Sequence, residues 1–177
     1  GGQLLWAGTA LDGDGVTTDN GWIAVRSAGD TERIFDTGKL KTPGAHNILN
    51  ALAAAACALS VGASHDAVAR GLASFGGVPH RIQLVGERDG VRFYNDSKAT
   101  TPESTVVAVR AFSGPVIPIL GGYDKGVSFD SMAEAIAGQV QWAALIGVTA
   151  DKIQSSLRRA GVESTVYPTL ESAFAAC

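Results

Sequence analysis

Strand-like and helix-like segments alternate from about residue 82 to the end of the sequence. One strand-like segment, residues 115–120, is apolar throughout, which is typical of a strand in a sheet covered on both faces. Because each helix returns the chain across the sheet, consecutive strands in such an arrangement run parallel. The alternation therefore predicts the α/β class, with a doubly wound parallel sheet in this half of the chain.

The same pattern predicts where the individual elements lie. The sequence Arg88-Asp89-Gly90 is typical of a tight hairpin turn between two short strands. We expect that hairpin at residues 82–85 and 91–94, further strands at 115–120, 142–146 and 165–167, and helices at 102–112, 131–138, 150–160 and from 170 onward.

The first half of the sequence has a different organisation. Short apolar runs between turn-rich spacers predict a small antiparallel meander, and two helices follow it. Cys57 lies inside the first helix, where its Ala-rich surroundings predict a core position. The expected strands are residues 4–7, 22–25 and 33–36, and the expected helices are residues 45–60 and 64–74.

The tetrapeptide Gly76-Gly77-Val78-Pro79 separates the two halves. Paired glycines followed by a proline are typical of a short domain linker. We therefore expect two domains, at residues 1–79 and 80–177.

Composition excludes several classes of protein. Hydrophobic residues make up 46% of the 177 residues and charged residues 18%, so the chain has enough apolar material for a sizeable core. The net charge of −3 and the lack of a basic stripe argue against nucleic-acid binding. No apolar run approaches the roughly 20 residues of a membrane span, and two cysteines do not make a disulfide framework. These features fit a protein of a reducing cytoplasm.

The most polar segment, Asn95–Thr100, lies between an expected strand and an expected helix. Ligands of open α/β sheets bind at the carboxyl ends of the strands, which is where this segment falls. Asp96, Lys98 and Thr100 are spaced two apart, so an extended or turning segment would direct them to one side. The alternative is a helix cap near Pro102 with a solvated lysine, and the residue types alone favour that alternative.

A glycine-rich segment, Gly121–Gly126, follows the next expected strand. It matches neither the dinucleotide-binding pattern nor the Walker phosphate loop, so a tight turn that needs positive φ is an equal interpretation. Lys125 favours a functional interpretation, because it would lie at the same sheet edge as Lys98. Two ammonium groups at one edge indicate an anionic ligand.

Two further pairs of polar residues are candidates for binding. His80 and Arg81 directly follow the linker and would face an interdomain cleft, unless they are simply solvated. Asn47 and Asn50 share one face of a helix start, where their amides can bind the edge of an adenine or, alternatively, cap the helix. We predict no metal-ligating residue in this chain.

Together these segments resemble the Mur ligase superfamily of peptidoglycan synthesis. Residues 44–51 resemble its G-x-H-N-x-x-N-A helix start, and residues 75–81 resemble its interdomain hinge. Residues 94–100 and 120–126 are most similar to the branch that adds D-glutamate. The resemblance implies the strand-and-helix end of a central ATPase domain before the hinge, and a Rossmann-like amino-acid-binding domain, incomplete at its end, after it.

The family reaction joins a carboxylate to an amine at the expense of ATP, through an acyl phosphate. The resemblance implies ATP and Mg²⁺ as cofactors, UDP-N-acetylmuramoyl-L-alanine and D-glutamate as partners, a cytoplasmic location and a monomer. It also implies a role for each candidate: adenine binding for Asn47 and Asn50, ribose or phosphate binding for Arg81 and Asp96, catalysis for Lys98 and His80, and D-glutamate binding for Thr100 and Lys125.

Two departures limit what the resemblance implies. Thr101 stands where the family usually has Asn, and the sequence contains no Gly-Lys-Ser/Thr phosphate loop. The missing phosphate loop, the absent initial Met and a helix-like end without a stop signal predict a segment of a longer ligase that is inactive alone. Two other interpretations stay open: another ATP-dependent amide ligase of the superfamily, and a non-catalytic nucleotide-binding module.

Overall fold

The structure, a computed structural model, describes residues 5–177 and divides into two compact units. The first unit runs to Asn95 and the second begins at Asp96. The contacts thus group the hairpin after the linker with the first unit, while the domain limit at 79/80 stays a prediction.

The first unit contains a three-stranded antiparallel sheet in the order β1-β2-β3. Each connection is a two-residue turn with both residues at positive φ, Asn20-Gly21 (47° and 82°) and Ala28-Gly29 (53° and 90°). Such turns match the twist of the flanking strands, which explains the tight meander. The strands are β1 (Gly15–Asp19), β2 (Trp22–Ser27) and β3 (Asp30–Asp36).

The N-terminal strand differs from the expectation. The strand expected at residues 4–7 is wrong in its described part, where Ala7 makes only an isolated bridge to Val16, and Leu4 lies outside the described residues. β1 instead occupies residues expected to be spacers. Val16 is its only large apolar residue, so the strand gives no alternating pattern, yet Val16 and Thr17 are buried at 0% and 1% exposure.

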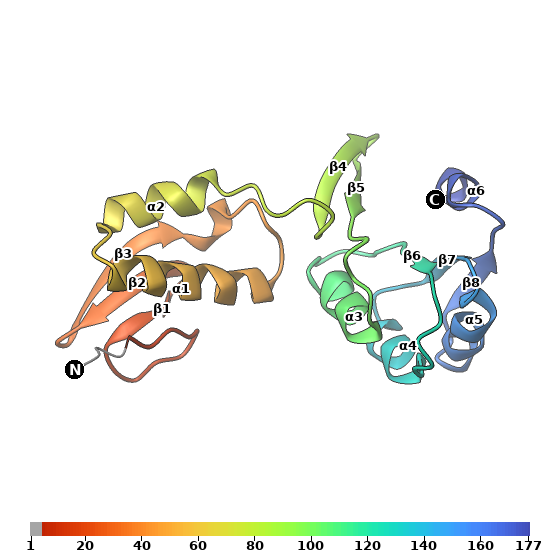
Figure 1. The fold of residues 1–177 in the computed structure, drawn as a ribbon, viewed down its shortest axis with the longest axis horizontal. Helices are drawn as coiled ribbons and strands as arrows, with labels where there is room; N and C mark the ends of the chain where they lie inside the picture. The colour runs from red at the N-terminus through yellow and green to blue at the C-terminus, as the bar shows by residue number, and fades with distance from the viewer. Residues whose placement is uncertain (1–4) are drawn as a thin grey trace. The chain divides into compact units, whose positions relative to one another are not determined.

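Two helices cover one face of this sheet (Figure 1). Ser64 begins the second helix by accepting a hydrogen bond from the Ala67 amide at 3.2 Å. Cys57 is exposed, contrary to the expected core position, because it lies about 140° around the first helix from the buried Leu52. The helical elements are η1 (Thr37–Lys39), α1 (Ala45–Ser60) and α2 (His65–Ser74). The core consists of Val16, Ile23, Phe35, Ala51, Leu52, Ala55, Ala56 and Val68.

A separate two-stranded antiparallel sheet follows the linker. It consists of β4 (Gln83–Arg88) and β5 (Val91–Asn95). Asp89 and Gly90 connect the two strands with φ of 52° and 80°. The predicted hairpin is therefore confirmed, including its Asp-Gly turn.

The second unit contains a three-stranded parallel sheet in the order β6-β7-β8. The central residues of β7, Ala143, Ala144 and Leu145, are all 0% exposed. Consecutive strand residues point to opposite faces, so this sheet is covered on both, as predicted for a doubly wound arrangement. The α/β class is thereby confirmed. The strands are β6 (Ile119–Gly121), β7 (Trp142–Ile146) and β8 (Glu163–Val166), and the helices are α3 (Pro102–Arg110), α4 (Asp130–Ile136), α5 (Ala150–Arg159) and α6 (Leu170–Ala176).

β6 is shorter than the strand predicted at residues 115–120. Pro115 and Pro118 lack an N–H donor, so the hydrogen-bonded ladder begins only at Ile119. Pro118 still contributes its carbonyl, which accepts from the Ala144 amide at 3.0 Å. Gly121 is the last residue of β6, so the glycine-rich segment begins at the carboxyl end of this strand.

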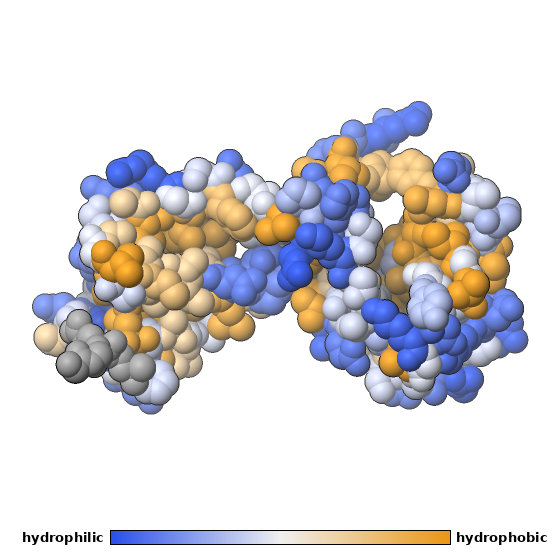
Figure 2. All heavy atoms as spheres, in the orientation of Figure 1, coloured by the Kyte–Doolittle hydropathy of each residue, from blue (hydrophilic) through white to orange (hydrophobic). Residues whose placement is uncertain are grey.

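Helix α5 contacts all three parallel strands, and α6 contacts β7. Apolar side chains also reach the surface of this unit (Figure 2). Two of them, Tyr123 and Val148, lie in the loops that follow β6 and β7. The core consists of Val109, Met132, Ala133, Ile136, Val140, Ala143, Leu145, Ala150, Ile153, Leu157 and Val162. No helix in the described part of the chain is long and apolar enough to cross a membrane.

Candidate functional site

The loops that follow β6 and β7 touch each other at the carboxyl edge of the parallel sheet. Gly121 has a φ of 151°, and a Cβ atom there would lie 1.9 Å from the Ile146 carbonyl oxygen. Gly147 has a φ of 74°, and its Cβ would lie 3.4 Å from the Gly122 amide nitrogen. Only glycine therefore fits at Gly121, and the two backbones meet where open α/β sheets bind ligands.

Residues of the β7–α5 connection hold the Gly121–Gly126 loop. The buried Thr149 hydroxyl donates to the Gly122 carbonyl oxygen at 3.2 Å. The Lys152 ammonium, in the first turn of α5, lies 3.2 and 3.4 Å from the two carboxylate oxygens of Asp124. Asp124 also accepts from the Gly126 amide at 2.8 Å. That amide and then the Lys152 ammonium keep the pKa of Asp124 below its ordinary value, so the carboxylate stays charged at neutral pH.

The structure brings two predicted substrate-binding residues together. The Lys125 ammonium donates to the Thr100 carbonyl oxygen at 3.0 Å, across 25 residues of sequence. Thr100 directly precedes Thr101, whose hydroxyl caps α3 by accepting from the Ser104 amide at 3.3 Å, with Pro102 in the first turn. The helix cap near Pro102, the alternative interpretation of this segment, is thus confirmed. The contact with Thr100 places the Lys125 ammonium beside the start of α3.

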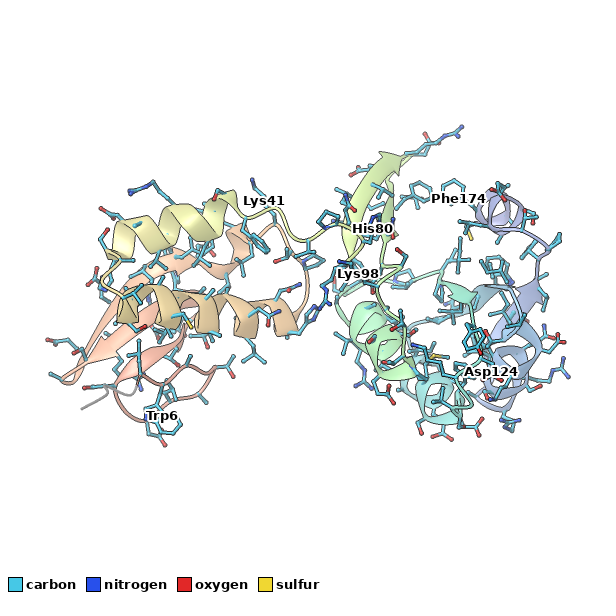
Figure 3. All side chains as sticks on the ribbon, in the orientation of Figure 1. Trp6, Lys41, His80, Lys98, Asp124 and Phe174 are labelled. Carbon is cyan, nitrogen blue, oxygen red and sulfur yellow. The ribbon has the colours of Figure 1, made fainter. Side chains whose placement is uncertain are left out.

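Lys98 occupies a different kind of position. It lies in a turn that the Ala99 amide closes onto the Asp96 carbonyl oxygen at 2.8 Å, and its side chain is exposed. Asp96, in the same turn, is half-buried. Figure 3 labels Lys98 in this turn and Asp124 in the loop after β6. Of the predicted residues in the second unit, Thr100 and Lys125 are therefore in direct contact, and Lys98 lies two residues before that contact.

In the first unit, the Asn47 and Asn50 side chains contact each other on α1. The Asn50 amide donates to the Asn47 side-chain oxygen at 3.2 Å, and Asn47 donates to the Pro43 carbonyl oxygen at 2.7 Å. The N-cap residue of α1 is Gly44, so no side chain caps the amino end of this helix. The capping alternative for the two asparagines is therefore wrong, and the exposed Asn50 amide is accessible to a ligand.

His80 and Arg81 begin the segment that leads into the hairpin. His80 has a φ of 64°, which is uncommon for a residue other than glycine, and its backbone amide donates to the Gln83 side chain at 2.9 Å. Its Nδ1 atom lies 3.1 Å from the Asn95 side-chain nitrogen. His80 is thus tied to the start of the candidate segment, and both His80 and Arg81 are exposed.

A cleft of about 420 Å³ lies next to the Gly121–Gly126 loop. On its wall, Asp130 accepts from the Ser156 hydroxyl at 2.6 Å and pairs with Arg159. These two contacts hold the pKa of Asp130 below its ordinary value. Among residues 5–177, no group of three or more His, Cys, Asp or Glu side chains could hold a metal ion. The cleft is lined by Gly126, Val127, Ser128, Phe129, Asp130, Lys152, Ser155, Ser156 and Arg159.

A family profile described as Mur ligase, glutamate ligase domain, matches residues 80–177, which is more than half of the chain. The chain belongs to the Mur ligase family. The matched region contains His80 and Arg81 together with every candidate residue of the second unit, so the loop around Lys125 is part of the Mur ligase domain itself.

Individual relatives extend the similarity to the residues before the match. UDP-N-acetylmuramoylalanine–D-glutamate ligase of Thermoanaerobacter sp. (strain X514) is 43% identical over 146 residues, which are 82% of this chain and 32% of the relative. The ligase of the same name from Geobacillus kaustophilus (strain HTA426) is 43% identical over 166 residues, 93% of this chain and 36% of the relative. This Mur ligase chain thus spans about a third of the length of the curated relatives it matches.

Solved structures show the same fold. MurF from Acinetobacter baumannii matches 94% of this chain and 38% of its own with a TM-score of 0.67, at 17% sequence identity. At that identity the likeness concerns the fold alone, and it agrees with the predicted α/β arrangement of a Mur ligase.

Sequence reasoning missed the residues that hold the Mur ligase loop in place. Asp124 and Lys152 are 28 positions apart, and no motif connects them. The available signal was weak: an acidic residue inside the Gly-rich segment and a lysine in the first turn of the next predicted helix. Thr149 and Gly147 are likewise recognisable only after the loops are seen side by side.

Proposed function

We propose that this Mur ligase chain is part of an ATP-dependent ligase that adds D-glutamate to UDP-N-acetylmuramoyl-L-alanine in peptidoglycan synthesis. The proposal draws on the ligases of that name that are 43% identical over up to 93% of the chain. The observation that carries it is the 3.0 Å contact between the Lys125 ammonium and the Thr100 carbonyl oxygen. It holds a cation at the carboxyl edge of the parallel sheet, beside the start of α3, where an anionic amino acid is expected.

D-glutamate carries two carboxylates, so its site needs cations and directed hydrogen-bond donors. An ammonium has three N–H donors, and the Thr100 contact uses one of those of Lys125. The remaining donors can bind a carboxylate, and the Thr100 hydroxyl can donate to the same group. We therefore assign Lys125 and Thr100 to D-glutamate binding.

Lys98 is assigned to catalysis because it is an exposed cation close in sequence to Thr100. In this reaction ATP supplies the phosphoryl group that activates the acceptor carboxylate, and Mg²⁺ offsets part of the negative charge. The Lys98 ammonium would lower the repulsion that remains when carboxylates and phosphates approach one another. His80, whose Nδ1 atom lies 3.1 Å from the Asn95 side-chain nitrogen, is assigned to catalysis through the family resemblance.

The remaining candidates fit a nucleotide. Asn47 orients the exposed Asn50 amide, whose oxygen and second N–H offer an acceptor and a donor side by side, which suits the edge of an adenine. The Arg81 guanidinium and the Asp96 carboxylate suit a phosphate and a ribose hydroxyl. We assign no residue of this chain to Mg²⁺, because Mg²⁺ is commonly held by phosphate oxygens and water with few protein ligands. A monomer located in the cytoplasm, where ATP and nucleotide-linked precursors occur, completes the proposal.

The experiment that tests this function is an amino-acid selectivity assay of a full-length ligase that contains this chain. Phosphate release should require UDP-N-acetylmuramoyl-L-alanine and D-glutamate together, and L-glutamate, as the matched control, should give little or none. Turnover with another amino acid in place of D-glutamate would identify a different amide ligase of the superfamily. ATP binding without turnover for any amino acid would support a non-catalytic nucleotide-binding module instead.

A further inference from the structure

Asp124 and Lys125 are neighbours in sequence, but their side chains make contacts with different elements. Asp124 pairs with Lys152 in the first turn of α5, with oxygen–nitrogen distances of 3.2 and 3.4 Å. Lys125 reaches the Thr100 carbonyl oxygen before α3. The loop thus contacts the start of α5 through Asp124 and the residue before the α3 cap through Lys125. A change in the contact with α5 would therefore change the direction in which the Lys125 side chain points.

We propose that Lys152 is a positioning residue for D-glutamate binding: through Asp124 it fixes the Gly121–Gly126 loop so that Lys125 presents its ammonium to the substrate carboxylate. This inference rests on the proposed function. Lys152 itself does not touch the substrate in this account, and its effect reaches the site only through the loop.

The hydrogen bonds of Asp124 explain how one ion pair can hold the Gly121–Gly126 loop in one conformation. The carboxylate oxygen that lies 3.2 Å from Lys152 also accepts from the Gly126 amide at 2.8 Å. The side chain of Asp124 therefore closes the short turn that contains Lys125, and Lys152 holds that closed turn against α5. A second contact acts on the residues after the turn, because the Lys152 ammonium lies 5.7 Å from the centre of the Phe129 ring.

Because the Asp124–Lys152 pair is exposed, its loss should affect D-glutamate binding without affecting the stability of the fold. The Lys152 and Asp124 side chains are 42% and 45% exposed, and exposed ion pairs contribute little to stability because water screens them. Removing Lys152 should therefore leave the free energy of unfolding nearly unchanged. The effect should appear in the affinity for D-glutamate, since Lys125 is no longer held in one direction.

The test measures D-glutamate kinetics in a full-length ligase that contains this chain. Lys152→Ala should raise the KM for D-glutamate by about 2- to 5-fold with a much smaller change in kcat, because uniform binding is lost rather than chemistry. Lys152→Arg should recover most of the affinity, because the positive charge is kept. Arg158→Ala, on the same helix and with the same loss of charge, is the matched control and should leave KM unchanged.

Asp124→Asn distinguishes the effect of the ion pair from the effect of the hydrogen bond that closes the turn. The asparagine oxygen can still accept from the Gly126 amide, but the attraction to Lys152 is lost. If the two residues act as one unit, the Asp124→Asn/Lys152→Ala double variant should have about the same KM as either single variant. Additive increases in KM would overturn a shared role for the pair.

A second measurement does not depend on the reaction. Hydrogen exchange of the backbone amides of residues 122–126 should be faster in Lys152→Ala than in the wild-type or the Arg158→Ala protein. Unchanged exchange together with an unchanged KM would overturn the proposal, and so would faster exchange with an unchanged KM. Faster exchange in a protein that does not use D-glutamate would instead reject the proposed function while supporting the role of Lys152 in fixing the loop.

Discussion

Two lysine-bearing segments of the second unit, around Lys125 and around Lys98, are held by different contacts. Lys125 lies in a loop that is fixed by backbone contact at Gly121, by the Thr149 hydroxyl and by the ion pair of Asp124. Lys98 lies in a different turn, which the Ala99 amide closes onto the Asp96 carbonyl oxygen, and it is exposed. At the level of sequence, each is simply a lysine after a strand.

The difference indicates two kinds of function. A fixed ammonium is suited to binding a carboxylate in one orientation, because its position is set before the ligand arrives. Lys125 and Lys98 are both exposed, so the difference lies in the contact that Lys125 makes with Thr100. The Lys98 ammonium can respond to charge that develops or moves during a reaction, and its contribution is electrostatic. We therefore expect loss of Lys125 to act on substrate affinity and loss of Lys98 to act on the rate.

The largest loss of stability and activity is expected from Gly121→Ala, because it places a Cβ atom at the start of the Gly121–Gly126 loop. The added Cβ would lie 1.9 Å from the Ile146 carbonyl oxygen at a φ of 151°, so the paired ends of β6 and β7 must separate. We expect the second unit to lose about 3 kcal/mol or more of unfolding free energy, measured by urea denaturation, and the ligase to lose its activity. Gly114→Ala, where a Cβ meets nothing within 4 Å, is the control. Equal stability of the two variants would show that Gly121 and Ile146 are not in the close contact described here.

Lys98→Ala should have the next largest effect, and only on turnover. We expect kcat for D-glutamate addition to fall by at least about 10², the scale of losing one electrostatic stabiliser. Because Lys98 is exposed, the unfolding free energy should stay the same. Steady-state kinetics with the denaturation midpoint as a control measures both, and normal turnover would remove Lys98 from the site.

Lys125→Ala should raise the KM for D-glutamate by about tenfold and change kcat less. The cause is the loss of a positioned cation next to Thr100. Lys125→Arg is a useful comparison, since it keeps the charge but not the compact ammonium, and it should be intermediate. An unchanged KM for both variants would favour the simple turn interpretation of the Gly121–Gly126 segment.

Thr101→Ala removes the cap of α3 and should cost about 1 kcal/mol of stability. Thr101→Ser keeps the hydroxyl and should cost only a fraction of that. If the cap also helps to hold Thr100 in contact with Lys125, Thr101→Ala should raise the KM for D-glutamate slightly as well. A loss of stability without any change in KM would show that the cap does not contribute to D-glutamate binding.

The smallest expected effect is in the pH dependence of Asp124. Its pKa in the folded protein lies below the ordinary 3.8, because the Gly126 amide and then Lys152 favour the charged form. A carboxylate with a depressed folded pKa adds its stabilising contribution above the unfolded pKa and loses it as the pH falls through the folded pKa. The side-chain carbon resonance of Asp124 should therefore titrate below pH 3.8, and in Lys152→Ala the midpoint should move upward. A midpoint at or above 3.8 in the wild-type protein would contradict the ion pair.

Much of the fold could be predicted because its signals are local. The hairpin was recognisable from Asp89-Gly90, and the helix at 45–60 from its apolar spacing, and both occur as expected. β1 could not be predicted, since the burial of Thr17 depends on partners supplied by β2. The shortening of β6 was visible in principle, because Pro115 and Pro118 lack the donors that a continuous strand needs.

The site was predictable only in part, because some of its contacts join residues that are far apart in the sequence. Lys125 and Thr100 could be proposed from their place at the sheet edge, and the structure brings them into contact. The residues that hold the loop, Asp124 and Lys152, come from separate elements, and only the folded chain reveals their pairing. Residue types indicate which chemistry is present at an edge, whereas tertiary contacts determine which groups are fixed there.

The central claim is that Lys125 and Thr100 form the D-glutamate site, and a crystal structure of a full-length ligase containing this chain with bound D-glutamate tests it most directly. We predict a D-glutamate carboxylate within hydrogen-bonding distance of the Lys125 ammonium and the Thr100 hydroxyl, with the Asp124–Lys152 pair intact. An amino acid bound elsewhere, with the Lys125–Thr100 contact unchanged and facing solvent, would contradict the account.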